Sequence, residues 1–472
     1  MALFQAGREL RAPRANRINA PRTGNGRLLG LVIITNNSIG GIGRFIRSRR
    51  EDFKRSEVYD SAKLLSILCC VRIEASRSGA SPVRTLLHCG IVLALAVAAY
   101  WAGLLAWADH LSRSSQLADR QRAVRMAPGA SLYERLADKI EETSGDPLAA
   151  LAHAANLDPA NAEYRMRVGL RAEAAGQFDV AERNLLKAAR LSRLYQPRYL
   201  LAQYYFRRQN ADEFFKWAHA AFDLAYGDVL PLLDLCWRMR PEAEWLQARA
   251  LSRRPEIARQ YLVFLSRHQQ MEPAEVLAGQ LSESAVAADL PALLEFCDRS
   301  LAAGRPAHPV KVWNRLCLNR LLPFEALDPA KGISLTDGRF AHWAFGQGFD
   351  WRLNDADGVT SRRMNGELRV TFSGRQAEWC AMAWQYLAVR PGGRYRLRWA
   401  LRGIDVDSPD GVCWKLYDLA GRRVAAETGG GSLTFAAPSD VLVLMLSYER
   451  PMGLPRLAGT AAVTQVALEM ER

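Results

Sequence analysis

The residues that could do acid–base, nucleophilic or metal chemistry are scattered along this 472-residue chain. Seven histidines fall at positions 88, 110, 153, 219, 268, 308 and 342, and no H-E-x-x-H pair is present to hold zinc. There is no G-x-S-x-G nucleophile turn, and no dinucleotide-binding fingerprint opens a strand–helix unit. We therefore predict a protein that is not an enzyme and has no catalytic residue, metal site or cofactor.

Acidic residues near the C-terminus offer the remaining chemistry. Asp405 and Asp407 form a close pair, but a glycosidase needs two carboxylates on opposite sides of a sugar, and sequence spacing cannot show that. In "LNDADG", aligning Gly358 with the glycine of a calcium-binding loop puts Leu353 where the first carboxylate belongs. We expect an Asp-rich turn here, and keep a polysaccharide-modifying enzyme as an alternative.

The elements that must position these residues change in type along the chain. Residues 323–472 contain short runs with period-two alternation, such as "GELRVTFSG", "RYRLRWALRG" and "VLVLMLSYER". Each run is bounded by Gly, Pro, Asn or Asp, and no helical pattern separates them. About eight or nine such strands predict an antiparallel β-sandwich.

This region resembles the jelly-roll, galactose-binding-like modules of bacterial carbohydrate-binding proteins. The resemblance rests on Phe340, which follows Asp337 and Gly338, and on the "PGGRY" turn at 391–395. It implies a domain in which exposed aromatic rings hold the apolar faces of sugars while polar neighbours bind the hydroxyl groups.

We select two tryptophans with polar neighbours as the candidate glycan platforms. They are Trp351, which lies between Asp350 and Arg352, and Trp384. A sandwich of this size also needs aromatic residues in its core, and a partner protein could contact the same rings. The glycan site is therefore one of three interpretations of these residues.

Two cysteines, Cys380 and Cys413, lie beside tryptophans in predicted strands of the sandwich. Outside the cytoplasm they could form a disulfide. Disulfide geometry could equally forbid this pairing, and two buried free thiols are the alternative.

Residues 109–322 have apolar residues at spacings of three and four, which predicts successive amphipathic helices. Breakers such as "SGDP", "AAGQ" and "RRPE" divide them into helical hairpins. The segment "AEYRMRVGLRAEAAGQFDVAERNLLKAARLSRLY", which starts at Ala162, resembles a tetratricopeptide repeat (TPR), and its two neighbours are degenerate copies. An α-solenoid is the broader prediction.

Small residues occupy the repeat positions where two helices cross closely. They are Gly169, Gly176, Ala181 and Ala188 in the best repeat, and Ala202 and Ala221 in the next. The best repeat departs from the pattern at its fourth position, where Arg165 replaces an aromatic residue. The resemblance implies a scaffold that binds a protein, with a simple spacer as the alternative.

The stretch "LLHCGIVLALAVAAYWAGLLAW" carries no charged residue. About 20 apolar residues are enough to cross a bilayer, so residues 85–108 are predicted to form a transmembrane helix. The "AWA" at 106–108 has the form of a signal-peptidase site, which makes a cleaved signal the alternative.

Residues 1–84 contain 16 Lys and Arg against 6 Asp and Glu and have little pattern, so we expect a disordered tail. The positive-inside rule places this tail in the cytoplasm and the rest of the chain beyond a bacterial inner membrane, in the periplasm. A true start at Val83 is an alternative. No nucleic-acid-binding module is recognisable, so we expect no nucleic-acid partner.

Together these patterns predict a single-pass membrane protein with an α-solenoid followed by a β-sandwich. We expect a non-catalytic scaffold in cell-envelope or exopolysaccharide assembly, with a protein partner on the repeats and glycan on the sandwich. A pure protein-interaction factor is the main alternative.

Overall fold

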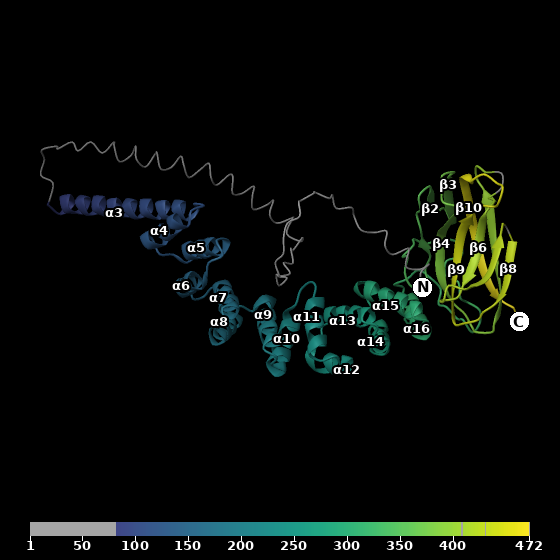
Figure 1. Ribbon diagram of the computed structural model, residues 1–472, viewed down its shortest axis with the longest axis horizontal. Coiled ribbons are helices and arrows are strands. Elements are labelled where there is room, and N and C mark those ends of the chain that lie inside the picture. The colour runs from purple at the N-terminus through teal and green to yellow at the C-terminus, as the bar shows by residue number, and fades with distance from the viewer. Residues whose placement is uncertain (1–81, 407–408, 430, 472) are drawn as a thin grey trace, which may run out of the picture. The chain divides into compact units, whose positions relative to one another are not determined.

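The computed structural model describes residues 82–406, 409–429 and 431–471, so residues 1–81 of the predicted tail lie outside it. Within these ranges, fourteen α-helices precede ten β-strands (Figure 1). The helices are α3 Pro82–Ser112, α4 Leu117–Met126, α5 Ala130–Glu142, α6 Leu148–Leu157, α7 Ala162–Ala174, α8 Phe178–Leu191, α9 Tyr195–Arg207, α10 Ala211–Leu224, α11 Leu230–Met239, α12 Ala243–Trp245, α13 Pro255–Arg267, α14 Met271–Glu283, α15 Leu290–Ala302 and α16 Ala307–Leu318. The predicted fold class, an α-solenoid followed by an antiparallel β-sandwich, is confirmed.

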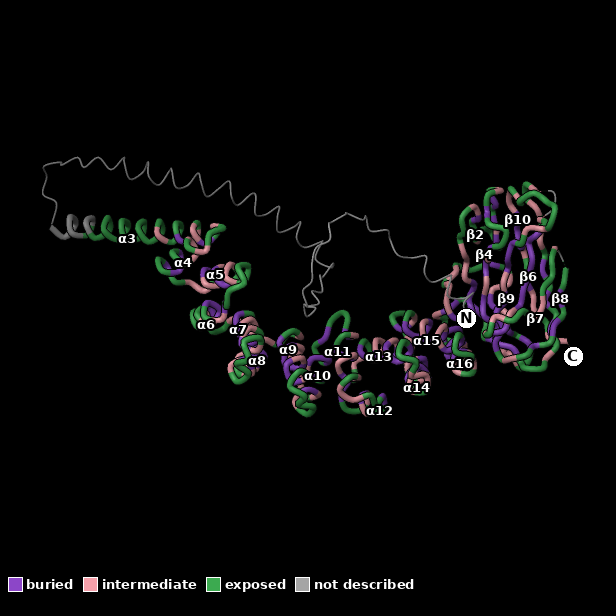
Figure 2. The backbone as a smooth tube through the Cα atoms, in the orientation of Figure 1, coloured by how far each residue is buried: buried purple, intermediate pink, exposed green. Residues whose placement is uncertain are grey.

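Helix α3 contains the apolar stretch seen in the sequence. Its residues Gly90–Ser112 are the one helical segment in the described ranges that is long and apolar enough to cross a membrane. Large apolar side chains such as Leu93, Tyr100 and Trp107 are exposed along it, and Figure 2 shows the middle of the helix in the colour of exposed residues. An exposed apolar surface of this length is typical of a segment that contacts a membrane or an apolar partner.

The helical hairpins turn in one recurring way. A residue with a left-handed backbone follows the first helix of five hairpins, with φ between 55° and 76°; these are Ser144, Gly176, Gln209, Gln269 and Gly304. The N–H of the next residue then donates to the carbonyl five positions earlier, at 2.8–3.0 Å. This Schellman-type closure satisfies a helix-end carbonyl and stops the helix. The turn geometry is therefore the same in hairpins whose sequences no longer match the repeat pattern.

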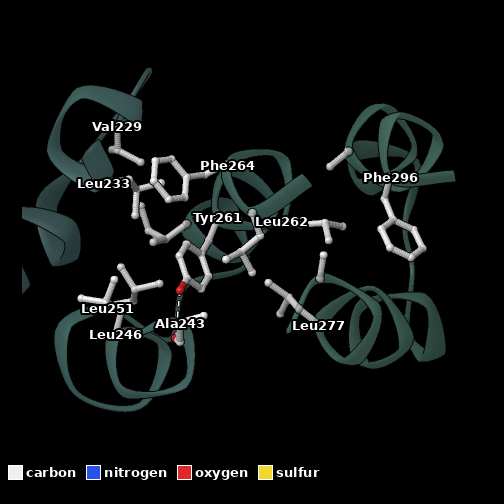
Figure 3. Packing of buried hydrophobic residues seen from close by; sticks show 14 of the residues in the cluster. Val229, Leu233, Ala243, Leu246, Leu251, Tyr261, Leu262, Phe264, Leu277 and Phe296 are labelled. Atoms are coloured by element: carbon white, nitrogen blue, oxygen red, sulfur yellow. Dashed lines mark hydrogen bonds between the residues drawn. The ribbon is translucent and has the colours of Figure 1, made fainter. Parts of the chain in front are cut away.

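One hairpin departs from this form. Its second helix, α12, is only three residues long and continues into a π turn, Leu246–Ala250. Tyr261 of α13 compensates, because its hydroxyl donates to the carbonyl oxygen of Ala243 at 2.8 Å while its ring lies among Leu246, Leu251 and neighbouring apolar residues (Figure 3). A single apolar core therefore continues from α7 to α16.

Ion pairs join the first helices of successive hairpins. They are Arg167–Glu134 at 3.1 Å, Arg207–Glu173 at 2.6 Å and Arg267–Glu295 at 2.9 Å. Solvent-accessible pairs of this kind contribute only about 0–1 kcal/mol each and weaken as salt is added. They therefore help to align the hairpins, while the buried apolar cluster provides most of the stability.

The ten strands form two five-stranded antiparallel sheets. The strands are β1 Arg352–Leu353, β2 Val359–Met364, β3 Glu367–Ser373, β4 Trp379–Ala388, β5 Arg394–Gly403, β6 Val412–Tyr417, β7 Arg423–Thr428, β8 Gly431–Ala436, β9 Val441–Glu449 and β10 Ala458–Met470. The first sheet has the order β1-β4-β9-β6-β7 and the second β2-β3-β10-β5-β8. Most connections therefore pass from one sheet to the other, as in a jelly roll.

Alternate side chains along the strands point inward and fill the space between the sheets. On β9, Leu442, Leu444, Leu446 and Tyr448 belong to the buried cluster of the sandwich, together with residues of both sheets. Each large side chain buried in this way contributes roughly 1.5–3 kcal/mol. Figure 2 shows the buried residues concentrated within the two sheets.

Glu367, at the start of β3, should make the stability of the sandwich depend on pH. It accepts hydrogen bonds from Arg402 and Arg369, both at 2.7 Å, and these lower its pKa below the ordinary value of 4.5. Because the folded state has the lower pKa, the stabilisation is present above about pH 4.5 and is lost as pH falls through that lower pKa.

We therefore expect Glu367→Gln to lower the free energy of unfolding near pH 7, and expect its difference from the wild type to shrink towards zero in acid. Urea unfolding of both proteins across this range measures the difference. Glu427→Gln is the control, because Glu427 is exposed and has no ion pair among the described residues. A Glu367→Gln difference that stays constant with pH would contradict the assignment.

Candidate functional site

The structure brings the four predicted glycan residues together, but two of them are buried. Asp350 and Trp351 are both 0% exposed. The Trp351 ring packs on Phe340 and Trp414, with ring centroids 5.3 and 5.9 Å apart, and its Nε1 donates to the carbonyl of Asp337 at 3.2 Å. A sugar cannot stack on this ring. The selection of Trp351 was wrong because sequence neighbours do not reveal which face of the chain a ring occupies.

The carboxylate of Asp350 is also buried and accepts hydrogen bonds from other residues of the protein. Its Oδ1 accepts a hydrogen bond from Nη2 of Arg363 at 2.9 Å, and its Oδ2 accepts one from the N–H of Phe345 at 2.6 Å. Arg363 also donates to Oδ2 of Asp337 at 2.8 Å. One buried arginine therefore clamps two buried carboxylates and fixes the loop before β1. This corrects the prediction that Asp350 binds sugar hydroxyls.

Arg352 and Trp384 lie where the sandwich meets the helical array. They face each other across β1 and β4, with the Arg352 guanidinium carbon 4.4 Å from the Trp384 ring centroid. Arg352 also forms an ion pair with Asp298 of α15 and donates to the carbonyl of Gly348 at 3.0 Å. These contacts give the pair a structural role, which replaces the predicted role of Arg352 in sugar binding.

Apolar contacts continue this junction. The ring of Trp313 on α16 stacks on Phe324 at 5.6 Å and meets Phe349 edge-on at 5.7 Å. Tyr386 of β4 and Val443 of β9 belong to the same buried cluster as the helices. The core of the array therefore continues past the boundary predicted between residues 322 and 323. Nothing in the sequence pattern of either region signalled this shared core.

Two other rings of the sandwich region reach solvent. Trp343 is 88% exposed in the loop before β1, and Trp379 is 44% exposed at the start of β4. Trp379 lies opposite Glu449 on β9, whose Oε2 accepts a hydrogen bond from Nζ of Lys415 at 2.5 Å. Neither ring stands out in the sequence, because the neighbours of Trp343 and Trp379 are no more polar than those of the buried tryptophans.

Of the two alternatives for Cys380 and Cys413, the structure has the buried free thiols, and no disulfide joins them. They lie on β4 and β6, which flank β9, and they pair with Tyr448 and Ser447 respectively. Two strand spacings amount to about 10 Å, and adjacent β9 partners point to opposite faces of the sheet. A disulfide needs Cα atoms within about 7 Å of each other, so bridging these two cysteines would require β9 to leave its place between β4 and β6.

The predicted packing residues of the repeat divide into two groups. Ala181, Ala188, Ala202 and Ala221 are completely buried. A Cβ on Gly169 would lie 2.7 Å from Cγ of Leu185, so α7 and α8 approach closely there. Gly176 differs, because nothing lies within 4 Å of its would-be Cβ and its φ is +74°. Its selection as a packing residue is corrected: it makes the left-handed turn.

Gly169→Ala should therefore lower the free energy of unfolding by about 1–3 kcal/mol, because an added methyl overpacks the crossing. Gly279→Ala is the matched control within α14, where nothing lies within 4 Å of the new Cβ. There the exchange should stabilise by roughly 0.5–1 kcal/mol through helix propensity. Urea denaturation measures both variants, and equal effects at the two sites would contradict the close crossing.

The helical array contains a groove of about 450 Å³ that is lined by α6, α7 and α8. Its walls include Ala149 and Ala152 of α6 and Val180 and Asn184 of α8, and Arg165 of α7 lies between them. The lining contains one carboxylate, Asp146, and no His, Cys, Ser or Lys. This composition suits binding rather than nucleophilic catalysis.

Arg165 is only 9% exposed. Its Nη2 donates to the carbonyl of Ala155 at 2.6 Å and its Nη1 to Oδ1 of Asn184 at 3.3 Å. Its Nε has no hydrogen-bond partner in the described part of the chain. The sequence did mark this position, since Arg165 stands where the repeat has an aromatic residue.

No protein-family model matches this chain. No curated protein matches its sequence either. Solved structures that resemble parts of it at low sequence identity include three from bacteria. They are accessory secretory protein 1,2 and 3 of Streptococcus pneumoniae (11% identity, 24% of this chain, 87% of that chain, TM-score 0.19), pilF of Pseudomonas aeruginosa (13%, 44%, 82%, 0.23) and the glycosylation associate protein (Gap123) complex of Streptococcus agalactiae (12%, 28%, 41%, 0.19). These TM-scores are too low to carry any function over to this chain.

Across the described residues, no group of three or more His, Cys, Asp or Glu side chains is placed to hold a metal ion. The features with unexplained chemistry are then the groove around Arg165 and the exposed rings of the sandwich region. The groove is the stronger candidate, because it combines a concave surface with a buried charge that the protein itself compensates only in part.

Proposed function

We propose that this protein is a non-catalytic, membrane-anchored scaffold in cell-envelope or exopolysaccharide assembly, and that its helical array binds a protein partner. The groove between α6 and α8 carries the proposal, since it is a concave surface with apolar walls and one buried polar atom, Nε of Arg165, that has no hydrogen-bond partner among the described residues. Arrays of helical hairpins characteristically offer extended binding surfaces. The rival role of a spacer requires no such groove.

Site-specific photocrosslinking in the full-length protein in its own membrane tests this function. A photoreactive residue in place of Ala152, on the groove wall, should give one discrete covalent adduct that mass spectrometry identifies. The same residue in place of Arg190, which is exposed on α8 outside the groove lining, is the control. Equal labelling at both positions, or none at Ala152, would favour the spacer role.

The proposed topology has α3 in the inner membrane, the basic tail in the cytoplasm, and the array and sandwich in the periplasm. The charge of the first 84 residues, 16 basic against 6 acidic, supports it. Alkaline phosphatase fused after Glu471 should be active, while the same enzyme fused after Arg84 should be inactive. The reverse pattern would overturn the orientation.

Glycan binding by the sandwich region is a second candidate, and the exposure of Trp343 and Trp379 favours it. A glycan array with the full chain in detergent should then show saturable binding that Trp343→Ala or Trp379→Ala removes. Trp351→Phe serves as the control for a buried ring. Absence of binding to bacterial polysaccharides would leave a pure protein-interaction factor.

A further inference from the structure

We propose that the groove between α6 and α8 receives the carboxylate of an Asp or Glu side chain from the partner protein, and that Arg165 pairs with it. The inference rests on the proposed scaffold function and names the chemistry by which the partner is recognised. Three observations support it. The Arg165 charge has only neutral hydrogen-bond acceptors, the groove walls are largely apolar, and the lining contains one cation and one carboxylate.

The charge of Arg165 is nearly out of water and has no carboxylate partner among the described residues. A guanidinium has five N–H donors. Here two neutral oxygens accept hydrogen bonds from the Nη atoms, and the Nε–H has no acceptor. Burying a charge is costly unless an opposite charge and hydrogen bonds compensate it. Arg363, whose side chain is 8% exposed, is by contrast paired with two carboxylates, those of Asp337 and Asp350.

Neighbouring helices fix the guanidinium at the groove. The carbonyl of Ala155 holds Nη2 from α6, and the amide of Asn184 approaches Nη1 from α8. The Asn184 contact is long, at 3.3 Å, and the same amide donates to the carbonyl of Val180 at 2.8 Å. A carboxylate entering the groove can replace this weak neutral acceptor with a charge-assisted one at little cost.

The lining selects a singly charged group carried by a polypeptide. Arg165 is its only cation, and Asp146 lies in the same lining, so a doubly charged phosphate would be undercompensated and repelled. Ala149, Ala152, Val168 and Val180 present apolar surface on either side of the charge. Residues flanking an acidic side chain in a protein segment can cover that surface, whereas a free small anion cannot.

Peptide selection on the full chain in nanodiscs tests the inference. A display library of random nine-residue peptides, competed against the chain that carries Arg165→Met, should enrich peptides with an acidic residue at one fixed position. The best synthetic peptide should bind at least tenfold more weakly when that residue is changed to Gln or Asn. Amidation of its C-terminus should leave the affinity unchanged, which separates a side-chain carboxylate from a terminal one.

The variants form a double-mutant cycle. With Arg165→Met, the acidic peptide and its amide variant should bind equally, and Arg165→Lys should restore part of the difference because it keeps the charge. Arg190→Met, which removes an exposed charge from α8, should keep the full difference. Far-UV circular dichroism checks that each variant folds.

The remaining outcomes separate the two proposals. Peptides that are selected without an acidic preference and compete with crosslinking at Ala152 would overturn the carboxylate inference and leave the scaffold function standing. Peptides whose preference survives Arg165→Met would overturn it as well. If no peptide is selected and no adduct forms at Ala152, both proposals fail.

Discussion

Trp313→Ala is expected to lower the free energy of unfolding by about 3–5 kcal/mol. Trp313 is fully buried on α16 and contacts Phe324 and Phe349. A Cβ on Gly348 would lie only 2.6 Å from its ring, so the loop before β1 is packed tightly against it. Truncation leaves a cavity between the last hairpin and the sandwich. Denaturation in detergent, followed by near-ultraviolet circular dichroism, measures the loss.

Leu318→Ala on the same helix is the matched control, because Leu318 is 73% exposed. Its effect should stay within about 0.5 kcal/mol. In the wild type, the last hairpin and the sandwich should unfold in one transition because they share a core. Trp313→Ala should separate that transition into two. If the variants had equal stability, the shared core would not hold the two regions together.

Arg363→Met is expected to lower the free energy of unfolding by about 3–5 kcal/mol, since it strands two buried carboxylates. The side chains of Arg363, Asp337 and Asp350 are at most 8% exposed. Arg363 bonds to both carboxylates and to the carbonyl of His342, at 2.8–2.9 Å. Its loss should loosen the loop from 337 to 350, which urea unfolding and limited proteolysis detect.

The neighbouring Arg362 offers a control of the same type. It pairs with Asp355 at 2.9 Å, but both side chains are more than half exposed, so Arg362→Met should cost no more than about 1 kcal/mol. Adding Asp350→Asn to Arg363→Met should recover part of the loss, because one stranded charge disappears. If Arg363→Met cost no more than Arg362→Met, the clamp would have no structural role.

The helical array shows what periodicity can and cannot reveal. Apolar spacing predicted the hairpins, because each helix must bury one face. The left-handed turn residue is glycine in only two of five hairpins, and Ser144, Gln209 and Gln269 occupy it elsewhere. Because three residue types adopt this backbone conformation, no single residue type identifies the turn in the sequence. The hairpin turn is therefore recognisable in the structure at positions where the sequence no longer matches the repeat pattern.

The candidate site was harder to predict than the fold. Alternation located the strands, but a tryptophan in a loop has no alternation, and polar neighbours pointed to Trp351, which is buried, instead of Trp343, which is exposed. Likewise, nothing local to Arg352 indicates that its partner is Asp298, 54 positions earlier. The departure of Arg165 from the repeat pattern was visible in the sequence, but only the structure shows that Arg165 lines a groove.

The shared core at the junction also sets an order of events during synthesis. The N-terminal hairpins complete their packing as they emerge, because their partners are close in sequence. The last hairpin ends at Leu318, but its buried cluster includes Val443, which is made 125 residues later. At roughly 5–20 residues per second, its apolar face waits about 6–25 s for that strand. During synthesis, the last hairpin should therefore expose an apolar surface for several seconds. A chaperone that prevents aggregation would have to bind it in this interval.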